Sequence, residues 1–150
     1  MMVVVICLLT WLLPMCHGLT IFSLSPQTTP EEIVSAQLVA LQKDDMQTVF
    51  DFASPGNKAN VHDDVRIFDR MVRSSVYVYL LRHETAEILM TATYPNKNEQ
   101  WQGLVRVLPN NIINNNSPAA EVKEYWWVLS RCKTGPHKEC FMVDADMPNS

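Results

Sequence analysis

Few residues in this chain have the type and spacing that a reaction needs. The adjacent carboxylates Asp44 and Asp45 could serve acid–base chemistry or hold a metal ion. However, neighbouring side chains at the start of a helix point in different directions and do not converge on one atom. A carboxylate at that place accepts a hydrogen bond from a free backbone amide of the helix. We therefore interpret Asp44 as a helix cap rather than as a catalytic group.

A second candidate site is the pair Cys132 and Cys140, which flanks the seven residues 133–139 with their Gly-Pro turn. In an oxidising compartment such a pair favours a disulfide, which would stabilise a short hairpin by about 2–3 kcal/mol in the chain-entropy model. Two buried free thiols are the alternative, because a sequence gives no distance between them. His137 lies nearby, but a structural zinc ion needs four ligands in two close pairs. We predict no metal site and no cofactor.

Aromatic residues supply the remaining candidates. Tyr94, Trp101 and Trp126 could line a ligand pocket, although an aromatic strand face is more often plain core. An isomerase-like reaction would need a hydrogen-bond donor and a base, and the candidates for these roles are Tyr77, Tyr79 and Tyr94 as donors with Asp69 or His62 as base. The chain has no Gly-x-Ser-x-Gly turn and no Gly-rich phosphate loop. The sequence therefore favours a protein without catalytic activity.

The first eighteen residues predict export. They carry no charged side chain, contain an apolar run over residues 3–13, and end with small residues at Cys16 and Gly18, as a secretory signal peptide does before cleavage. The run is too short to span a hydrocarbon core of about 30 Å, so we expect no membrane association once the signal is removed. The predicted location is outside the cell, or in an endomembrane or periplasmic lumen.

Charge and composition restrict the partners. The net charge is −4 and no cluster of Lys and Arg occurs, which argues against nucleic acid because phosphate binding requires a basic face. Residues 109–120 are rich in Asn and predict an exposed loop. Within it, Asn115 begins a glycosylation acceptor sequence, although Pro118 directly after the acceptor makes its use less favourable.

Three helices must position the N-terminal candidates. Residues 29–32 (Thr-Pro-Glu-Glu) have the pattern of a capping box with proline at the first helical position, and this helix should end near Lys43. A second helix is predicted over 44–54, where Pro55 stops it. The third begins near Asp63 or Asp64 and should carry an apolar face inward, formed by Val65, Phe68, Met71 and Val72.

After the helices, nearly every segment predicts a strand. The expected strands cover 76–80, 84–94, 101–107, 122–131 and 139–143. Residues 84–94 alternate as a half-buried antiparallel strand does, and Leu89 is the one exception to a face made of Ala86, Ile88, Met90, Ala92 and Tyr94. Residues 145–150 are expected to fray.

Helices followed by strands, one of them with a Tyr-Trp-Trp sequence, resemble the cone-shaped fold of nuclear transport factor two and ketosteroid isomerase. In that fold a curved antiparallel sheet wraps around the longest helix and leaves a pocket open at one end. More narrowly, residues 36–45, 50–55 and 68–72 are similar to the domain of unknown function 4864, and residues 125–129 with the Gly135 turn fit its last hairpin. The similarity covers about Pro30 to Val143, and the cysteine pair and the Asn-rich loop depart from it.

The sequence thus predicts one α+β domain over residues 29–144, with N-terminal helices packed on a curved antiparallel sheet in a cone-shaped, cystatin-like roll. A signal peptide (1–18) and a leader (19–28) precede it. The resemblance implies a fold and not an activity. Our leading hypothesis is a non-catalytic module that binds a small apolar ligand or associates with itself. The alternatives are a lyase or isomerase of the ketosteroid-isomerase kind and a purely structural homodimer.

Overall fold

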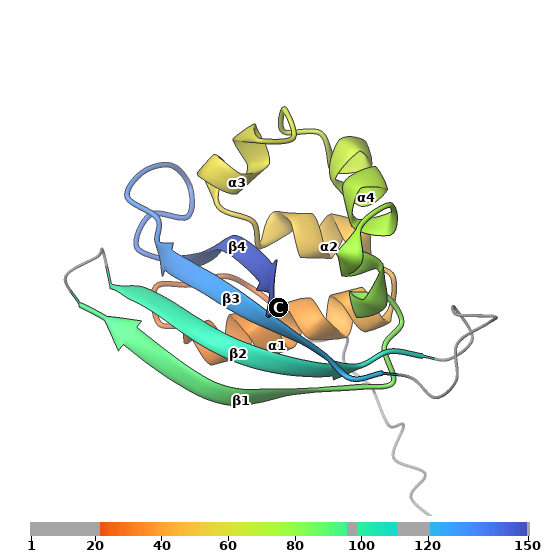
Figure 1. The fold of residues 1–150 in the computed structure, drawn as a ribbon. Helices are drawn as coiled ribbons and strands as arrows, with labels where there is room; N and C mark the ends of the chain where they lie inside the picture. Colours follow the sequence, from red (N-terminus) through yellow and green to blue (C-terminus); the bar gives the residue numbers. More distant parts are fainter. Residues whose placement is uncertain (1–21, 96–98, 111–120, 150) are drawn as a thin grey trace, which may run out of the picture.

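The computed structural model describes residues 22–95, 99–110 and 121–149 (Figure 1). Its elements, in chain order, are α1 (Pro30–Gln42), α2 (Met46–Asp51), α3 (Pro55–Ala59), α4 (Val65–Arg73), the 3-10 helix η1 (Val76–Leu80), β1 (Thr85–Tyr94), β2 (Gln100–Leu108), β3 (Lys123–Arg131) and β4 (Phe141–Pro148). Helices come first and strands follow, so the predicted α+β class is confirmed. The predicted signal peptide and Asn115 lie outside the described residues. No helix within the described ranges is long and apolar enough to cross a bilayer.

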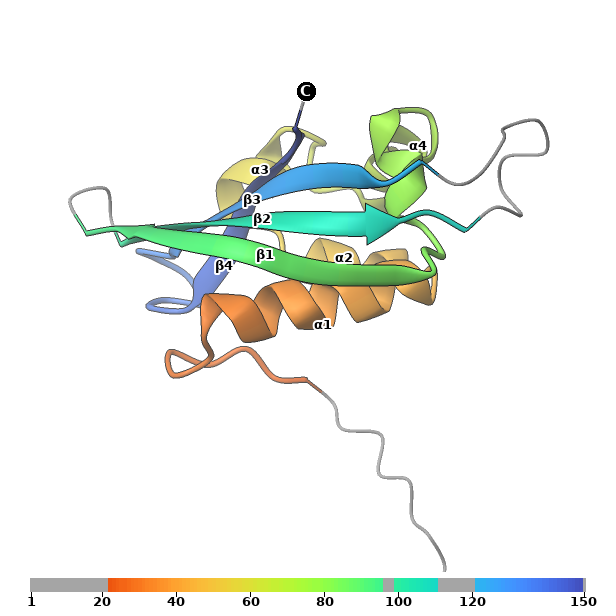
Figure 2. The same cartoon turned by 60° about the horizontal axis from the view of Figure 1, so that its bottom comes forward.

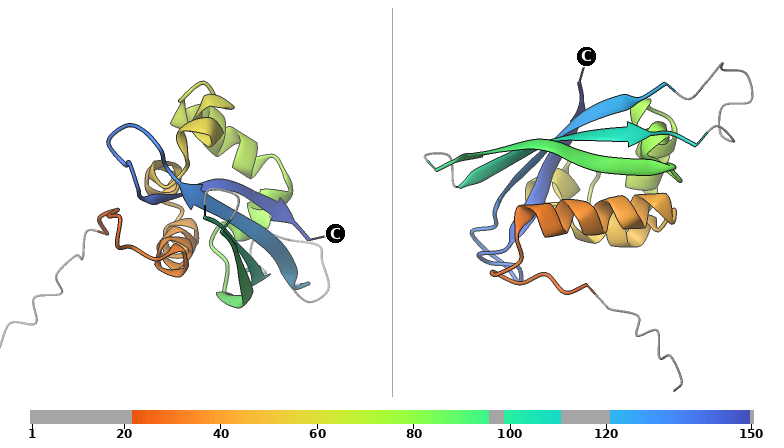
Figure 3. Two further views of the ribbon diagram at one scale, coloured as in Figure 1. Left: turned by 90° about the vertical axis from the view of Figure 1, so that its left-hand side faces the viewer. Right: turned by 90° about the horizontal axis from the view of Figure 1, so that it is seen from below.

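The strands form one antiparallel sheet in the order β1-β2-β3-β4. In Figure 1 the strands pass in front of α1, and Figure 2 shows α1 lying along the sheet, below the strands in that view. Both views of Figure 3 show the helices gathered on one side of the sheet. The middle of the opposite face carries no helix of the described chain, and we call it the helix-free face.

The N-terminal cap of α1 is confirmed. The Thr29 amide donates to Glu32 Oε2 at 2.8 Å, and the Glu32 amide donates to Thr29 Oγ1 at 3.2 Å, so both free amides of the capping box are satisfied. The helix then buries one face, made of Ile33, Val34, Gln37, Leu38 and Leu41. The cap therefore fixes where α1 begins, and its apolar face fixes how α1 lies on the sheet.

The cap of α2 is Asp45, so the assignment to Asp44 was wrong. Asp45 Oδ1 accepts from the Thr48 amide at 3.2 Å. Asp44 instead has a φ of 62° and ends α1, with its amide bonded to the Leu41 carbonyl and the Asp45 amide bonded to the Ala40 carbonyl. This is a Schellman motif, in which the residue after the helix is left-handed. Each aspartate serves a different helix.

Three parts of the chain before the sheet differ from the prediction. Residues 76–80 form the 3-10 helix η1 and not a strand, because Ser75 Oγ accepts from the Tyr77 amide at 3.3 Å and starts a tight turn. Pro55 begins α3, with Ser54 as its cap, whereas α2 already ends at Asp51. Met71 on α4 faces solvent rather than the core.

A β-bulge in β1 reverses the predicted face of that strand. The register shifts between Ile88 and Met90, which leaves Leu89 as the extra residue. Ile88 pairs with inward-facing Val105, but Met90 pairs with Leu104, whose side chain points the other way. Because a one-residue shift moves every later side chain to the other face, the second half of β1 turns three apolar residues to the helix-free face: Met90, Ala92 and Tyr94.

The C-terminal strand is longer than predicted. Residues 145–148, which were expected to fray, pair with residues 125–128 of β3. Within β4, Asp144 is the extra residue of a second register shift, and its carboxylate accepts from Ser130 Oγ at 2.6 Å. The pairing carries β4 to Pro148 and places Asp146 and Met147 on opposite faces of the sheet.

Two tryptophans tie the inner face of the sheet to α1. Trp127 is fully buried and its indole N–H donates to Gln37 Oε1 at 2.7 Å, while Gln37 Nε2 donates to the Val49 carbonyl of α2 at 3.3 Å. The ring of Trp101 lies over Gly103, where an added Cβ would sit 2.2 Å from the ring. The space between the sheet and the helices is therefore filled by side chains that reach the helices.

Replacing Gln37 by Ala should destabilise the protein strongly. The indole N–H of Trp127 and the Val49 carbonyl would both lose their hydrogen-bond partner in a dry interior, at a cost of about 2–4 kcal/mol in the free energy of unfolding. Urea unfolding measures this loss. The matched control is Ser35→Ala on the exposed side of α1, which should change stability by less than about 0.5 kcal/mol. Equal effects of the two substitutions would contradict the bridge.

Candidate functional site

The structure does not bring the three predicted pocket-lining residues together. Tyr94 is 44% exposed at the end of β1, and the bulge places it on the helix-free face. Trp126 is half-buried on the same face, opposite Leu104. Trp101 is buried on the inner face, where its indole N–H donates to Glu31 Oε1 at 2.9 Å. No pocket can therefore be lined by all three.

The proposed bases lie away from the tyrosines. His62 is exposed in the loop before α4, with a φ of 55°. Asp69 lies on the surface of α4, where it accepts from Arg73 Nε at 2.8 Å. Tyr79 is half-buried, with the Lys123 ammonium 5.4 Å from its ring centre. Neither His62 nor Asp69 converges with a tyrosine on a common site.

Tyr77 instead meets a carboxylate that sequence reasoning missed. Its hydroxyl donates to the backbone carbonyl of Asp146 at 2.9 Å, and its ring centre lies 6.3 Å from that of Tyr125. The Tyr125 hydroxyl donates to the Val76 carbonyl at 2.8 Å. Asp146 pairs with Trp127, and directly opposed residues share one face of a sheet. Its carboxyl group is therefore on the inner face, beside the two tyrosines.

The environment of Asp146 makes it a weak acid. Burial raises the pKa of this carboxyl group from 3.8 to about 6, and a hydrogen bond from its own amide opposes part of that shift. Burial also raises the pKa of Tyr125 and of Tyr77, and the negative charge of Asp146 raises both further. Asp146 therefore loses its proton near pH 6 rather than near pH 4. Both phenol hydroxyls already donate to backbone carbonyls, so neither is available to polarise a substrate.

The sequence indicates a strand at Asp146 but not its inward direction, because the register shift at Asp144 puts Val143 and Asp146 on one face. Residues 143–147 (Val-Asp-Ala-Asp-Met) alternate apolar and acidic side chains, a pattern typical of a strand. The predicted strand instead ended at Val143, and residues 145–150 were expected to fray.

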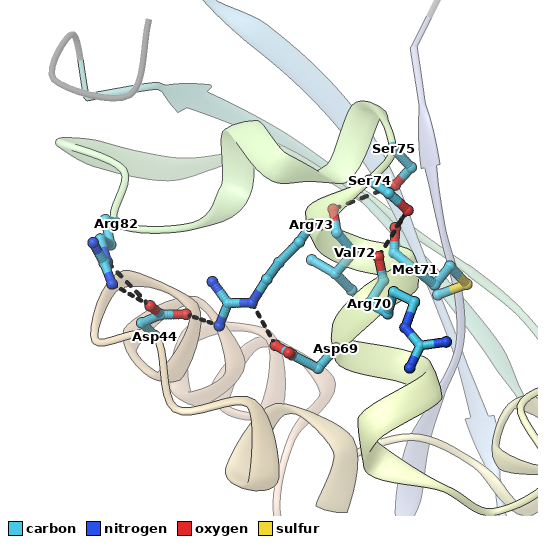
Figure 4. A network of polar contacts seen from close by, with 9 residues as sticks. All are labelled: Asp44, Asp69, Arg70, Met71, Val72, Arg73, Ser74, Ser75 and Arg82. Carbon is cyan, nitrogen blue, oxygen red and sulfur yellow. Dashed lines mark hydrogen bonds and ion pairs between the residues drawn. The ribbon is translucent and has the colours of Figure 1, made fainter.

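Asp44, the first residue of the double aspartate, lies in a structural ion-pair network (Figure 4). The Asp44 carboxylate accepts from Arg73 Nη2 at 2.7 Å and from Arg82 Nη2 at 2.5 Å, and Arg73 also reaches Asp69. Burial alone would raise the pKa of Asp44, but the hydrogen bonds and charges of Arg73 and Arg82 outweigh it and lower the pKa overall. The network joins the end of α1 to α4 and to the loop before β1.

The described residues show neither a metal-binding cluster nor a disulfide. Among the described residues, no group of three or more His, Cys, Asp or Glu side chains could hold a metal ion. Cys132 and Cys140 are both free thiols, half-buried and buried respectively. The disulfide predicted from the sequence is therefore not present in the structure.

A groove of about 1040 Å³ lies on the outer surface of the helices, between residues 22–24, α1 and α2. Its apolar wall is formed by Phe22, Leu24, Val39 and Phe52, and its rim carries charges of both signs at Glu32, Lys43, Asp51 and Lys58. None of the three predicted pocket-lining aromatics belongs to its lining.

The helix-free face carries a row of large apolar residues that is exposed at its two ends, half-buried at Trp126 and buried at Leu104. Met90, Leu104, Trp126 and Met147 are consecutive cross-strand partners from β1 to β4, and we call them the apolar row. Met90 is 56% exposed and Met147 46%. On one side of the row, Arg106 lies between Glu87 at 3.5 Å and Glu124 at 3.2 Å.

The helices and first two strands decide the family. The model of the family described as "Domain of unknown function (DUF4864)" matches residues 24–112. The chain belongs to this family. No curated protein and no solved structure matches it. The segment that identifies this DUF4864 protein ends before β3, so Trp126, Asp146 and both cysteines of the hairpin lie beyond it. The family match therefore does not extend to these residues.

Replacing Asp44 by Asn in this DUF4864 protein should weaken the fold at neutral pH. The pKa of Asp44 is lowered in the folded state, so its stabilising effect is present above the unfolded value of 3.8 and is lost as the pH falls through the folded value. We expect a loss of about 1–2 kcal/mol at pH 7 that shrinks below pH 3. Asp63→Asn is the matched control, because Asp63 is exposed and also left-handed. A loss that persists unchanged at low pH would contradict the network.

Replacing Asp146 by Asn should have the opposite effect. The folded pKa of about 6 lies above the unfolded value of 3.8, so the wild-type protein loses stability as the pH rises between these values. Asn resembles the neutral acid, and the variant should be more stable by about 1–3 kcal/mol above pH 7, with the gain vanishing below pH 4. Urea unfolding between pH 4 and pH 8 measures the difference. A gain that does not depend on pH would show that Asp146 is not held in a desolvated site.

Proposed function

We propose that this DUF4864 domain is a non-catalytic association module and that the helix-free face is its binding surface. The apolar row is the observation that carries the proposal. Its outer members, Met90 and Met147, are about half exposed, and no charged residue interrupts the row. Large apolar side chains grouped on an uncovered face typically mark a binding site.

The interior between the sheet and the helices is filled, which favours association with a partner over binding of a small ligand inside the domain. Trp127, Tyr125 and Leu129 of β3 are fully buried, and the polar atoms of Trp127 and Tyr125 are bonded to the helices and to η1. A ligand site needs an apolar pocket with polar groups left free to orient the ligand. The inner face offers neither at β3.

We propose that the partner is a second copy of this chain. The apolar row reads Met-Leu-Trp-Met across the four strands, so it is nearly symmetric about the line between β2 and β3. A twofold axis parallel to the strands would set Met90 against Met147 of the second copy, and Arg106 against Glu124 of the second copy. Such an interface is isologous, and it pairs apolar with apolar and basic with acidic groups.

The size of the face sets the expected strength. Four strands spaced about 4.8 Å apart and about 30 Å long give a face of roughly 550 Å² on each copy. Two copies would then bury about 1,100 Å² in total, at the low end of specific interfaces. We therefore expect a weak, micromolar dimer whose population depends on protein concentration.

Two further elements complete the proposal. Residues 1–18 support export, which would place the module outside the cell or in a lumen. The curved sheet packed on α1 supports kinship with the cone-shaped superfamily of nuclear transport factor two. Both are consistent with a binding role, because that fold hosts proteins without catalytic activity.

Introducing charge into the apolar row should break the dimer. Met90→Glu and Met147→Glu each place a carboxylate in the row at an exposed position that the fold tolerates, and each should weaken self-association at least about tenfold. Sedimentation velocity of the purified protein between about 1 and 100 μM measures the shift, a range that brackets the weak dimer expected for this area. The control is Ile67→Glu, an exposed apolar position on α4. A monomer throughout this range, or equal effects of all three substitutions, would refute the proposal.

A further inference from the structure

We propose that Cys132 and Cys140 form a dithiol site that reacts with small disulfides. In this site Cys132 reacts first and Cys140 resolves the resulting mixed disulfide. The proposal rests on the geometry of the β3–β4 hairpin and is independent of the helix-free face.

The two cysteines oppose each other at the neck of the hairpin. The Cys132 amide donates to the Cys140 carbonyl at 2.8 Å, one residue beyond Arg131–Phe141, the last pair of the ladder, while the Cys140 amide donates to the His137 carbonyl at 3.0 Å. Directly opposed residues have Cβ atoms about 4.5–5.5 Å apart on one face of the sheet, and a disulfide needs about 3.5–4.5 Å. The Cβ atoms would therefore have to approach by about 1 Å, and the thiols would have to turn away from the carbonyls of Thr134 and Lys138 to form the bond.

The neck is held in place by its neighbours. The Glu139 amide donates to the Cys132 carbonyl at 2.8 Å, with Glu139 at a φ of 67°. Arg131 Nη1 donates to the Glu139 carbonyl at 2.7 Å, and its guanidinium lies 4.3 Å from the ring centre of Phe141. These contacts keep the cysteines opposed before any bond forms between them, so oxidation requires little further loss of conformational entropy.

The two thiols differ in access. Cys132 is half-buried, and its thiol donates to the Thr134 carbonyl at 3.0 Å. It borders a cavity of about 570 Å³ between the hairpin and α3, whose wall also carries Lys58 and His137. Cys140 is only 4% exposed and does not line this cavity. A small disulfide can therefore reach Cys132 and leave through the same cavity.

Electrostatics support the same order. Burial raises the pKa of the Cys140 thiol, and a negative charge on Cys132 raises it further, while Arg131 opposes part of the shift. Burial therefore favours the protonated form of the Cys140 thiol. Once Cys132 is bound in a mixed disulfide, its charge is gone and Cys140 ionises more readily, which is when its thiolate is needed.

The chemistry balances as two thiol–disulfide exchanges. The Cys132 thiolate attacks one sulfur of a small disulfide R–S–S–R, the S–S bond breaks, and one R–S⁻ leaves and takes up a proton. The Cys140 thiolate then attacks Sγ of Cys132 and expels the second R–S⁻, which is also protonated. In sum, one small disulfide is reduced to two thiols and the two cysteines are oxidised to one disulfide.

Oxidised glutathione tests the order of the two steps. The full chain should carry Cys7→Ser and Cys16→Ser, so that only the hairpin cysteines react, and mass spectrometry should follow the products near pH 8. This parent protein should lose two hydrogens without accumulating an adduct. With Cys140→Ser the glutathione adduct should accumulate on Cys132, and with Cys132→Ser the reaction should be at least about tenfold slower.

Two comparisons keep the test decisive. In urea the structural difference is removed, so Cys132→Ser and Cys140→Ser should react at similar rates there. If Cys140→Ser unfolds, Cys140→Ala serves in its place, because it leaves the same thiol in the cavity. Equal rates for the two serine variants in the folded protein, a stable adduct on the parent, or no oxidation at all would overturn the proposal.

Discussion

The hydrogen bond between Trp127 and Gln37 is the contact on which the rest of the structure depends. It joins the central strand β3 to α1, and Gln37 passes the connection to α2 through the Val49 carbonyl. All three groups are buried, and buried polar groups must find partners, so α1 cannot slide or rotate without breaking the bridge. The bridge also helps to fill the space between the sheet and the helices. Trp127 and Tyr125 pack against the helices and η1, and their polar atoms are already hydrogen-bonded. The helix-free face is the side of the sheet that the described helices leave uncovered.

The bulge at Leu89 decides what that face presents. Without the extra residue, Met90 would follow Ile88 onto the inner face by strict alternation, and the apolar row would lack its first member. With it, Met90 stands opposite Leu104, and the row runs unbroken to Met147. One residue added to a strand therefore determines whether the face is continuous, as expected where side chains alternate with a period of two. Bulges commonly re-aim a side chain in this way.

How much could be predicted from the sequence depended on how local the cause was. The capping box of Thr29 and Glu32 acts over three residues, and it was predicted correctly. The α+β order followed from periodicity, which is also local. By contrast, the role of Asp44 depends on Arg73 and Arg82, which are distant in sequence. The faces of Tyr94 and Trp126 depend on strand register, which no single segment encodes. Residues 76–80 look like a strand in isolation and become a 3-10 helix because Ser75 turns the chain there.

The end of β4 shows how the two faces of the sheet are connected. Asp146 points inward, where burial disfavours its charge, and the next residue, Met147, points outward and completes the apolar row. The strand end must therefore be held against the cost of an ionised carboxylate at neutral pH. The Tyr77 hydroxyl donates a hydrogen bond to the Asp146 carbonyl. The Asn149 amide donates to the Glu124 carbonyl, and the indole N–H of Trp126 donates to Asn149 Oδ1. Tyr77, chosen from the sequence as a catalytic donor, thus acts as a clamp that keeps Met147 in register with Trp126.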